Sequence, residues 1–222
     1  MEQKLEIMPS VELAYWMGVL QSDGCLTTRK YRDRKSQIIV KVEVAPKSLE
    51  MVKKFSQLSE LIFDRKAKIF ELGSGKFKFS IGVSQLIPIF ERLDIDARDP
   101  PRPPVWVSAD YTKFGAYLAG LIDGDGDVRI KRSKYPQCVV RITSGKAQIF
   151  LQKAVKEMLK CGVTITHRSG VSMLGDRKIV GKWYCMEFVV SKKTRDFIKK
   201  YILPEMTIEH KIRKLTDFLS NK

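Results

Sequence analysis

The sequence predicts an α+β protein made of two related halves, each with the order helix, two strands, helix, two strands, helix. Three observations predict this fold class. An apolar stretch occurs twice, apolar and polar residues alternate after each copy, and apolar residues then recur at helical spacing. Because the similarity repeats at about half the chain length, it indicates a duplicated unit.

The repeated stretch predicts an apolar helix that ends in acidic residues. Residues 14–24, AYWMGVLQSDG, align without gaps on residues 116–126, AYLAGLIDGDG. Gly18 and Gly120 each follow an alanine by four residues, and small residues at this spacing let two helix backbones approach closely. We therefore expect the two helices to pack side by side, the first beginning at Ser10 and ending at the glycine that closes its copy.

The composition points to a polyanionic partner. The 222 residues include 41 Lys and Arg against 25 Asp and Glu, a net charge of +16. Nucleic acid is the first candidate for such a chain and an anionic membrane surface the second. The apolar stretches fall short of the ~20 residues that cross a bilayer, and the first residues lack a signal-peptide pattern. We expect an intracellular, soluble protein without a membrane partner.

The rest of the first half predicts strands around a second helix. Residues 38–44 alternate between apolar and polar side chains, which indicates a half-buried strand, and residues 46–63 carry apolar side chains at helical spacing. Two more strands are expected at residues 67–72 and 76–83, joined by a glycine-containing turn. Their polar faces are typical of a surface that binds duplex DNA, although a solvated outer face would have the same pattern.

A proline-rich connector divides the chain. Residues 94–113 hold four prolines within residues 100–104 and show no periodicity, which predicts a stiff, extended segment. We therefore expect a first repeat at residues 1–93 and a second at residues 114–222.

The second half repeats the order of the first. The expected elements are strands at residues 128–131 and 140–143, a helix at residues 147–159 closed by Gly162, strands at residues 163–172 and 182–190 joined by a turn at residues 175–178, and two helices within residues 194–219 broken at Pro204.

The paired stretches resemble the motifs of the LAGLIDADG homing endonucleases in their single-chain, two-motif form. Residues 118–126 read LAGLIDGDG and differ from the name-giving string at Gly124, whereas residues 16–24 read WMGVLQSDG and carry Gln21 in place of the first Asp. The resemblance covers approximately residues 12–220. It implies two αββαββα repeats related by a pseudo-twofold axis, packed through their motif helices, with antiparallel sheets that form a DNA-binding saddle.

The resemblance assigns catalysis to the last acid of each motif, Asp23 and Asp125. Helices packed side by side would bring these carboxylates together at two helix C-termini, where a hard divalent cation relieves the repulsion and oxygen ligands favour Mg²⁺. Ser22 and Gly124, which precede the acids, can offer backbone carbonyls to the metal. The metal would activate a water and stabilise the leaving oxygen as each DNA strand is hydrolysed.

Four further residues are candidates for the catalytic site. Gln21 and Asp123 stand at the sixth motif position, and we expect them to be structural or to support the metal ligands. The family also places a basic residue from each half near the metals, and the candidates here are Arg98 and Lys211.

The polar faces of the predicted strands supply the candidates for DNA contact. Which of them contact bases and which contact phosphates stays open. The predicted groove-facing residues are Arg29, Arg32, Arg34, Gln37, Lys41, Lys78, Arg129, Lys131, Arg141, Arg168 and Lys182.

The expected function is that of an intron-encoded, monomeric homing endonuclease. It would hydrolyse both strands of a long, partly asymmetric double-stranded DNA site, with Mg²⁺ held between Asp23 and Asp125. An RNA-binding intron splicing factor (maturase) on the same scaffold is the alternative, with intron RNA as its partner. A DNA-binding regulator is a third hypothesis, but it should lack one or both acids. Retention of both acids favours the enzyme.

Overall fold

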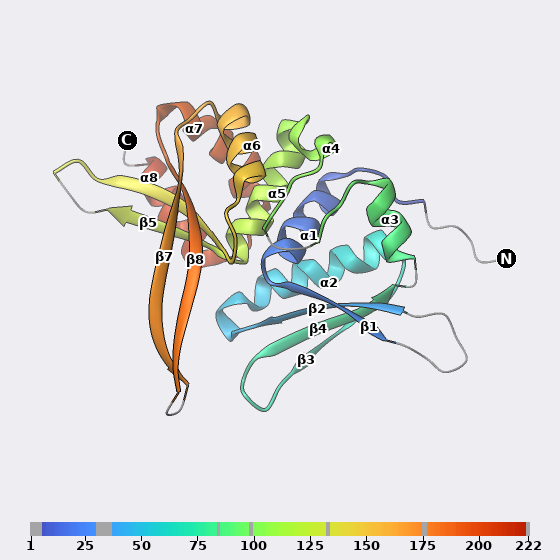
Figure 1. Cartoon of the computed structure of the whole chain (residues 1–222). Coiled ribbons are helices and arrows are strands. Elements are labelled where there is room, and N and C mark those ends of the chain that lie inside the picture. Colours follow the sequence, from blue (N-terminus) through green and yellow to red (C-terminus); the bar gives the residue numbers. More distant parts are fainter. Residues whose placement is uncertain are drawn as a thin grey trace.

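The computed structural model confirms an α+β protein with two four-stranded antiparallel sheets (Figure 1). The sheets have equivalent strand orders, β1-β2-β4-β3 in the first half and β5-β6-β8-β7 in the second, so the duplication extends to the topology. The structure describes residues 6–29, 37–83, 85–97, 100–131, 134–174 and 177–220.

The first half follows the predicted order of elements. The side chain of Ser10 accepts a hydrogen bond from the Leu13 N–H at 3.1 Å, which confirms the predicted start of the first helix. That helix ends one residue before Asp23, and Gly24 already belongs to the next strand. The elements are α1 (Val11–Ser22), β1 (Gly24–Arg29), β2 (Gln37–Val44), the 3₁₀ turn η1 (Pro46–Ser48), α2 (Leu49–Phe63), β3 (Lys68–Glu71), β4 (Phe77–Val83) and α3 (Leu86–Arg92).

The second half repeats this order after a short additional helix. Pro204 separates the last two α-helices, as predicted. The elements are α4 (Val105–Ser108), α5 (Tyr111–Asp123), β5 (Gly126–Lys131), β6 (Gln137–Ser144), α6 (Ile149–Leu159), β7 (Val163–Leu174), β8 (Arg177–Val189), α7 (Lys192–Phe197), the π-helical turn η2 (Ile198–Ile202), the 3₁₀ turn η3 (Leu203–Glu205) and α8 (Glu209–Ser220).

The connector differs from the prediction of an extended segment. α4 forms within it, and α5 begins at Tyr111, still inside the predicted linker. Asp110 explains the early start, because its carboxylate accepts hydrogen bonds from the N–H groups of Thr112 at 2.8 Å and Lys113 at 3.0 Å. An aspartate in this position satisfies N–H groups that the first turn of a helix leaves unpaired.

Two boundaries in the second half also differ from the prediction. α6 is closed by Lys160, which takes the left-handed conformation with φ of 51°, and not by Gly162. β8 begins at Arg177, within the turn predicted at residues 175–178, so the hairpin strands are longer than expected.

α1 and α5 pack side by side at the centre of the molecule (Figure 1). A Cβ atom at Gly18 would overlap the carbonyl oxygen of Tyr117, and one at Gly120 would overlap the carbonyl oxygen of Tyr15. Both helices are buried on all sides, which explains why neither has a polar face. The prediction that the two repeated helices form the central contact is confirmed.

Each sheet has one covered face and one open face. α2 packs on the first sheet, and α6 and α8 pack on the second. Buried side chains such as Val40 and Phe79 in the first sheet, and Val140 and Phe188 in the second, face the helices. Within the described parts of the chain, no helix is long and apolar enough to cross a membrane.

Candidate active site and nucleic-acid interface

The C-terminal ends of α1 and α5 meet at one end of the central contact. Asp23 is the C-cap residue of α1, and Gly124 is that of α5. A Cβ atom at Gly124 would overlap Ser22 Oγ and would lie 3.3 Å from Asp23 Oδ2. The carboxylate of Asp23 therefore lies beside the residue that precedes Asp125.

The chemistry of these ends fits a hard divalent cation. Burial raises the pKa of Asp23, and the charge of nearby Lys211 opposes the shift, while Asp125 is exposed. Within the described residues, no group of three or more His, Cys, Asp and Glu side chains could hold a metal ion. A cation here would be bound by two carboxylates together with backbone carbonyls and water, and this all-oxygen set is one that Mg²⁺ accepts.

Gln21 and Asp123 link the two central helices. The Tyr117 hydroxyl donates to Gln21 Oε1 at 2.6 Å, and the Tyr15 hydroxyl donates to Asp123 Oδ2 at 2.8 Å. Each residue at the sixth motif position is thus bonded by the tyrosine of the other helix. Both side chains are buried, at 5% and 1% exposure, so these hydrogen bonds join the two helices inside the core.

The same two side chains also anchor different segments of the chain. Gln21 Nε2 donates to the carbonyls of Asp96 and Arg102, and Oε1 accepts from the Arg102 N–H at 3.2 Å. Asp123 accepts from the Thr207 N–H at 2.7 Å and from its hydroxyl at 2.9 Å. An amide can donate as well as accept, whereas an ionised carboxylate only accepts. The carbonyls of Asp96 and Arg102 need a donor, which explains why residue 21 is glutamine and not the aspartate of the LAGLIDADG motif.

Lys211 caps the C-terminal end of α5. Its Nζ donates to the carbonyls of Ile122 at 2.7 Å, Asp123 at 2.8 Å and Gly124 at 3.2 Å. Burial lowers the pKa of Lys211, while the charges of Asp123 and Asp23 raise it. The ammonium group lies near Asp123 and Asp23, and its three protons are bonded to backbone carbonyls. A cation at this place also suits the negative end of the helix dipole.

The open face of the first sheet carries the predicted groove-facing residues that lie in it. Arg29 pairs with Gln37 across β1 and β2, while Lys41 lies opposite Ser80 and Lys78 opposite Glu43 across β2 and β4. Residues paired in this way share a face, and their neighbours in the strands are buried against α2.

A groove on this face also includes residues that were not predicted to contact DNA. Its volume is about 640 Å³, and Arg65, Lys66, Lys68 and the half-exposed ring of Phe70 lie along it together with Arg29 and Gln37. The basic residues that begin at residue 65, immediately before β3, could have indicated this groove. They were not predicted because the candidates were chosen from the alternation of residues within strands.

The open face of the second sheet carries cations paired with acids. Arg141 Nη2 lies 3.2 Å from Asp127 Oδ2, which Arg129 also contacts. Lys131 Nζ and Arg168 Nη2 lie 3.7 Å and 3.4 Å from the carboxylate of Glu187. The predicted residues Arg129, Lys131, Arg141 and Arg168 thus share one face.

Lys182 does not join this group. Lys182 is exposed, but it lies on the same side of β8 as Met186 and Phe188, which are buried against the helices, and therefore on the side opposite Arg168; the prediction that it shares the groove-facing side is wrong. The predicted residues Arg32, Arg34 and Arg98 lie outside the described residues.

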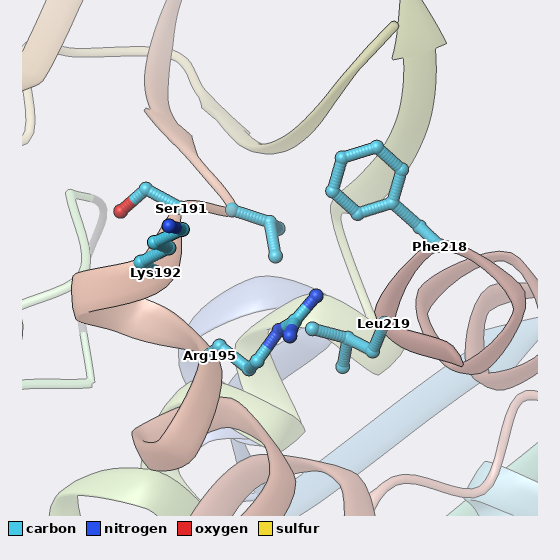
Figure 2. Close-up of a pocket in the computed structure, with 6 residues that line it drawn as sticks. Ser191, Lys192, Arg195, Phe218 and Leu219 are labelled. Atoms are coloured by element: carbon cyan, nitrogen blue, oxygen red, sulfur yellow. The ribbon is translucent and has the colours of Figure 1, made fainter. Parts of the chain in front are cut away.

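A separate pocket of about 270 Å³ lies between the start of α7 and the end of α8 (Figure 2). Figure 2 shows the side chain of Arg195 extending between these two elements, towards Leu219 and Phe218. None of the predicted site residues lines this pocket, so it is distinct from the paired motif ends.

Comparisons with known proteins identify the fold. No protein-family model and no curated protein sequence matches the chain. A mesophilic variant of the homing endonuclease I-DmoI matches with a TM-score of 0.53 and 19% identity, over 86% of this chain and 95% of that chain. The LAGLIDADG homing endonuclease I-LtrWI, bound to target DNA, matches with a TM-score of 0.54 and 16% identity, over 96% and 92% of the two chains. I-DmoI in complex with DNA and Mn matches with a TM-score of 0.51 and 19% identity, over 86% and 96%.

Proposed function

From its LAGLIDADG homing endonuclease fold, we propose that this protein is a site-specific endonuclease that hydrolyses both strands of double-stranded DNA with a divalent metal ion. The observation that carries the proposal is the meeting of the two motif ends, where Asp23 lies beside the residue before Asp125. Two further facts support it. The net charge of +16 suits a polyanion, and the similar structures of I-LtrWI and I-DmoI contain DNA, with Mn in one of them.

Asp23 and Asp125 would hold the metal, with backbone carbonyls of Ser22 and Gly124 as further oxygen ligands. We propose Mg²⁺ because it prefers carboxylate and water ligands. When bound, such an ion activates a water for attack on phosphorus and stabilises the leaving oxygen. Lys211 holds the carbonyls at the end of α5 and so fixes the backbone that leads to Asp125. With one acid from each half, each half would direct the cleavage of one strand.

The open faces of the two sheets would bind the DNA duplex. We propose that residues 1–93 and 114–222 each contact one half of a long target, with residues 94–113 as the connector, and that the protein acts as a monomer. The side chains on the two faces differ: among the described residues, Lys41 and Lys78 on the first face form no ion pair, whereas Lys131 and Arg141 on the second face pair with acids. The target is therefore expected to be asymmetric.

A cleavage assay tests the proposal. A plasmid that carries the uninterrupted allele of the gene housing this reading frame is incubated with purified protein in Mg²⁺, and in EDTA as the metal-free control. Asp125→Asn should abolish cleavage, whereas Asp217→Asn, a matched change at an exposed acid on α8, should leave it unchanged. Linear product from wild type and Asp217→Asn in Mg²⁺ alone would support the nuclease. Tight binding without any cleavage would contradict the nuclease and favour a protein that binds nucleic acid without cutting it, such as the RNA-binding splicing factor or the DNA-binding regulator.

A further inference from the structure

Glu187, like Asp127, is an acid among the cations on the open face of the second sheet. It lies on β8, and its side chain is only 16% exposed between Lys131 on β5 and Arg168 on β7. Because β5 and β7 are the two edge strands of the second sheet, this carboxylate joins cations from both edges across the open face.

The first sheet has a different arrangement. Within the described part of the chain, the open-face residues Lys41, Lys68 and Lys78 form no ion pair. On the open face of this sheet, Glu43 pairs with Lys76 at 3.3 Å, and both side chains are about half exposed. Among the described residues, the two halves therefore offer different chemistry to a duplex: Lys41, Lys68 and Lys78 have no carboxylate partner on the first sheet, whereas Lys131 and Arg168 share one on the second.

Neither stability nor charge balance accounts for Glu187. Partly exposed ion pairs typically contribute roughly 0–1 kcal/mol to folding. A carboxylate that faces DNA also repels phosphates, so it opposes non-specific binding by a protein of net charge +16. Its position is useful, however, for contacts with bases.

Carboxylate and guanidinium groups are among the side chains that distinguish base edges in the major groove. A carboxylate accepts a hydrogen bond from the exocyclic amino group of cytosine, and arginine donates two hydrogen bonds to guanine. Arg168 presents a planar fork of donors, and its contact with Glu187 at 3.4 Å restricts that fork before any DNA arrives. Restricted side chains lose less entropy on binding and tolerate fewer partners.

We propose that Glu187 is a specificity-determining residue, which accepts a hydrogen bond from a base amino group and orients Arg168 and Lys131 for the adjacent base pairs. This inference rests on the proposed function, because it requires that the open faces bind duplex DNA.

The test compares wild type with Glu187→Gln and with the control Glu50→Gln. Glu50 pairs with Lys53 at 2.8 Å on α2, so the control removes the same charge and an ion pair away from the open face. Each protein selects from a library of DNA duplexes with a randomised central block, and the selected sequences are counted. Affinity for a fixed, unrelated duplex and the melting temperature are measured in parallel.

Wild type and Glu50→Gln should select the same sequence. Glu187→Gln should lose about tenfold in base preference, as expected for one good base contact, at one or two neighbouring positions in one half of the site. Its affinity for the unrelated duplex should be equal or higher, because a charge that repels phosphates is removed.

Two outcomes would overturn this inference while leaving the proposed function intact: an unchanged selected sequence with Glu187→Gln, or an equal loss of preference at every position. If wild type selects no sequence, the proposed function itself fails, and the role of Glu187 fails with it.

Discussion

At the scale of single residues, Ser22 and Gly124 are complementary. Ser22 Oγ donates to the carbonyls of Gly18 at 3.0 Å and Val19 at 3.1 Å, which fixes it in the space that a side chain at residue 124 would need. The departure of Gly124 from the name-giving string, which has alanine there, thus follows from the serine in the other motif.

Gly124→Ala should therefore destabilise the protein by roughly 1–3 kcal/mol, the usual cost of forcing an extra methyl group into a packed site. Ser22→Gly in the same chain should recover a large part of this loss, because it vacates the space. Urea denaturation of the two single variants and the double variant measures the coupling. Strictly additive effects would show that the two residues do not compete for space.

Gln21 gives a second prediction at this scale. Gln21→Glu is nearly isosteric but places a carboxylate against the carbonyls of Asp96 and Arg102, which need a donor. The loss of stability should be about 3 kcal/mol, because a buried charge is left without its hydrogen bonds. The exposed Gln57 on α2 provides the control, and Gln57→Glu should change the melting temperature little. Equal effects of the two substitutions would contradict this structural role.

The pKa of Asp23 predicts a dependence of stability on pH. Burial raises this pKa in the folded protein, so the folded state holds the proton more tightly than the unfolded chain. The stability of wild type should therefore fall, relative to Asp23→Asn, as the pH rises from the unfolded pKa through the folded pKa. Denaturation in EDTA at several pH values measures the difference.

Asp217→Asn, at an exposed carboxyl on α8, serves as the reference for this experiment. If the stability of Asp23→Asn relative to wild type does not increase with pH, burial of the Asp23 charge is not the cause of the difference. Adding Mg²⁺ should stabilise wild type more than Asp23→Asn, since a bound ion favours the folded state.

The sequence predicted where the motif acids lie better than it predicted the contacts around them. The resemblance pointed to Asp23 and Asp125, which the structure brings to the same end of the central contact. The partners of Gln21 could not be predicted, because Asp96 and Arg102 lie 75 and 81 residues away in the sequence. The ion pair between Arg168 and Glu187 depends in the same way on a strand register that the sequence does not specify.

At the scale of elements, the contact between α1 and α5 depends on glycine. Gly18→Ala and Gly120→Ala should each cost roughly 3 kcal/mol, because the added methyl group meets the backbone of the facing helix, which cannot rotate aside. Gly73→Ala, in the turn between β3 and β4, is the matched control because nothing lies within 4 Å of its added Cβ. Thermal melting of the three variants measures the loss of stability that each substitution causes. A small effect at Gly18 would mean that the helices can move apart at little cost.

Elements with a strong periodic signal were predicted well, and short ones were not. The central helices and most strands follow apolar patterns that reflect burial on one side or on all sides. α4 has only four residues and depends on tertiary contacts, among them the Trp106 indole N–H donated to the Leu93 carbonyl at 2.8 Å. Lys160 ends α6 in a left-handed conformation that glycine adopts more readily, so the sequence pointed to Gly162 instead.

At the scale of the whole molecule, the surplus of positive charge predicts salt-dependent DNA binding. Lys41→Gln should weaken binding to all duplexes alike and reduce the slope of log K against log salt by about one, as expected when one phosphate contact is lost. Lys156→Gln, on the exposed side of α6, should leave the slope unchanged. Titrations at several salt concentrations measure both slopes. A sequence-dependent loss for Lys41→Gln would instead assign it to a base.

The reciprocal contact of Gly18 and Gly120 would suit two identical chains as well as the two halves of one chain. In an assembly of identical subunits, every substitution appears twice, once on each side of the axis. Here each substitution appears once, so Gln21 can bond to a connector that has no symmetry mate while Asp123 bonds to the segment before α8. Joining the halves covalently therefore lets each side of the molecule vary independently. On the proposed mode of binding, a change in one half-site of the DNA can then be matched by a change in one half of the protein.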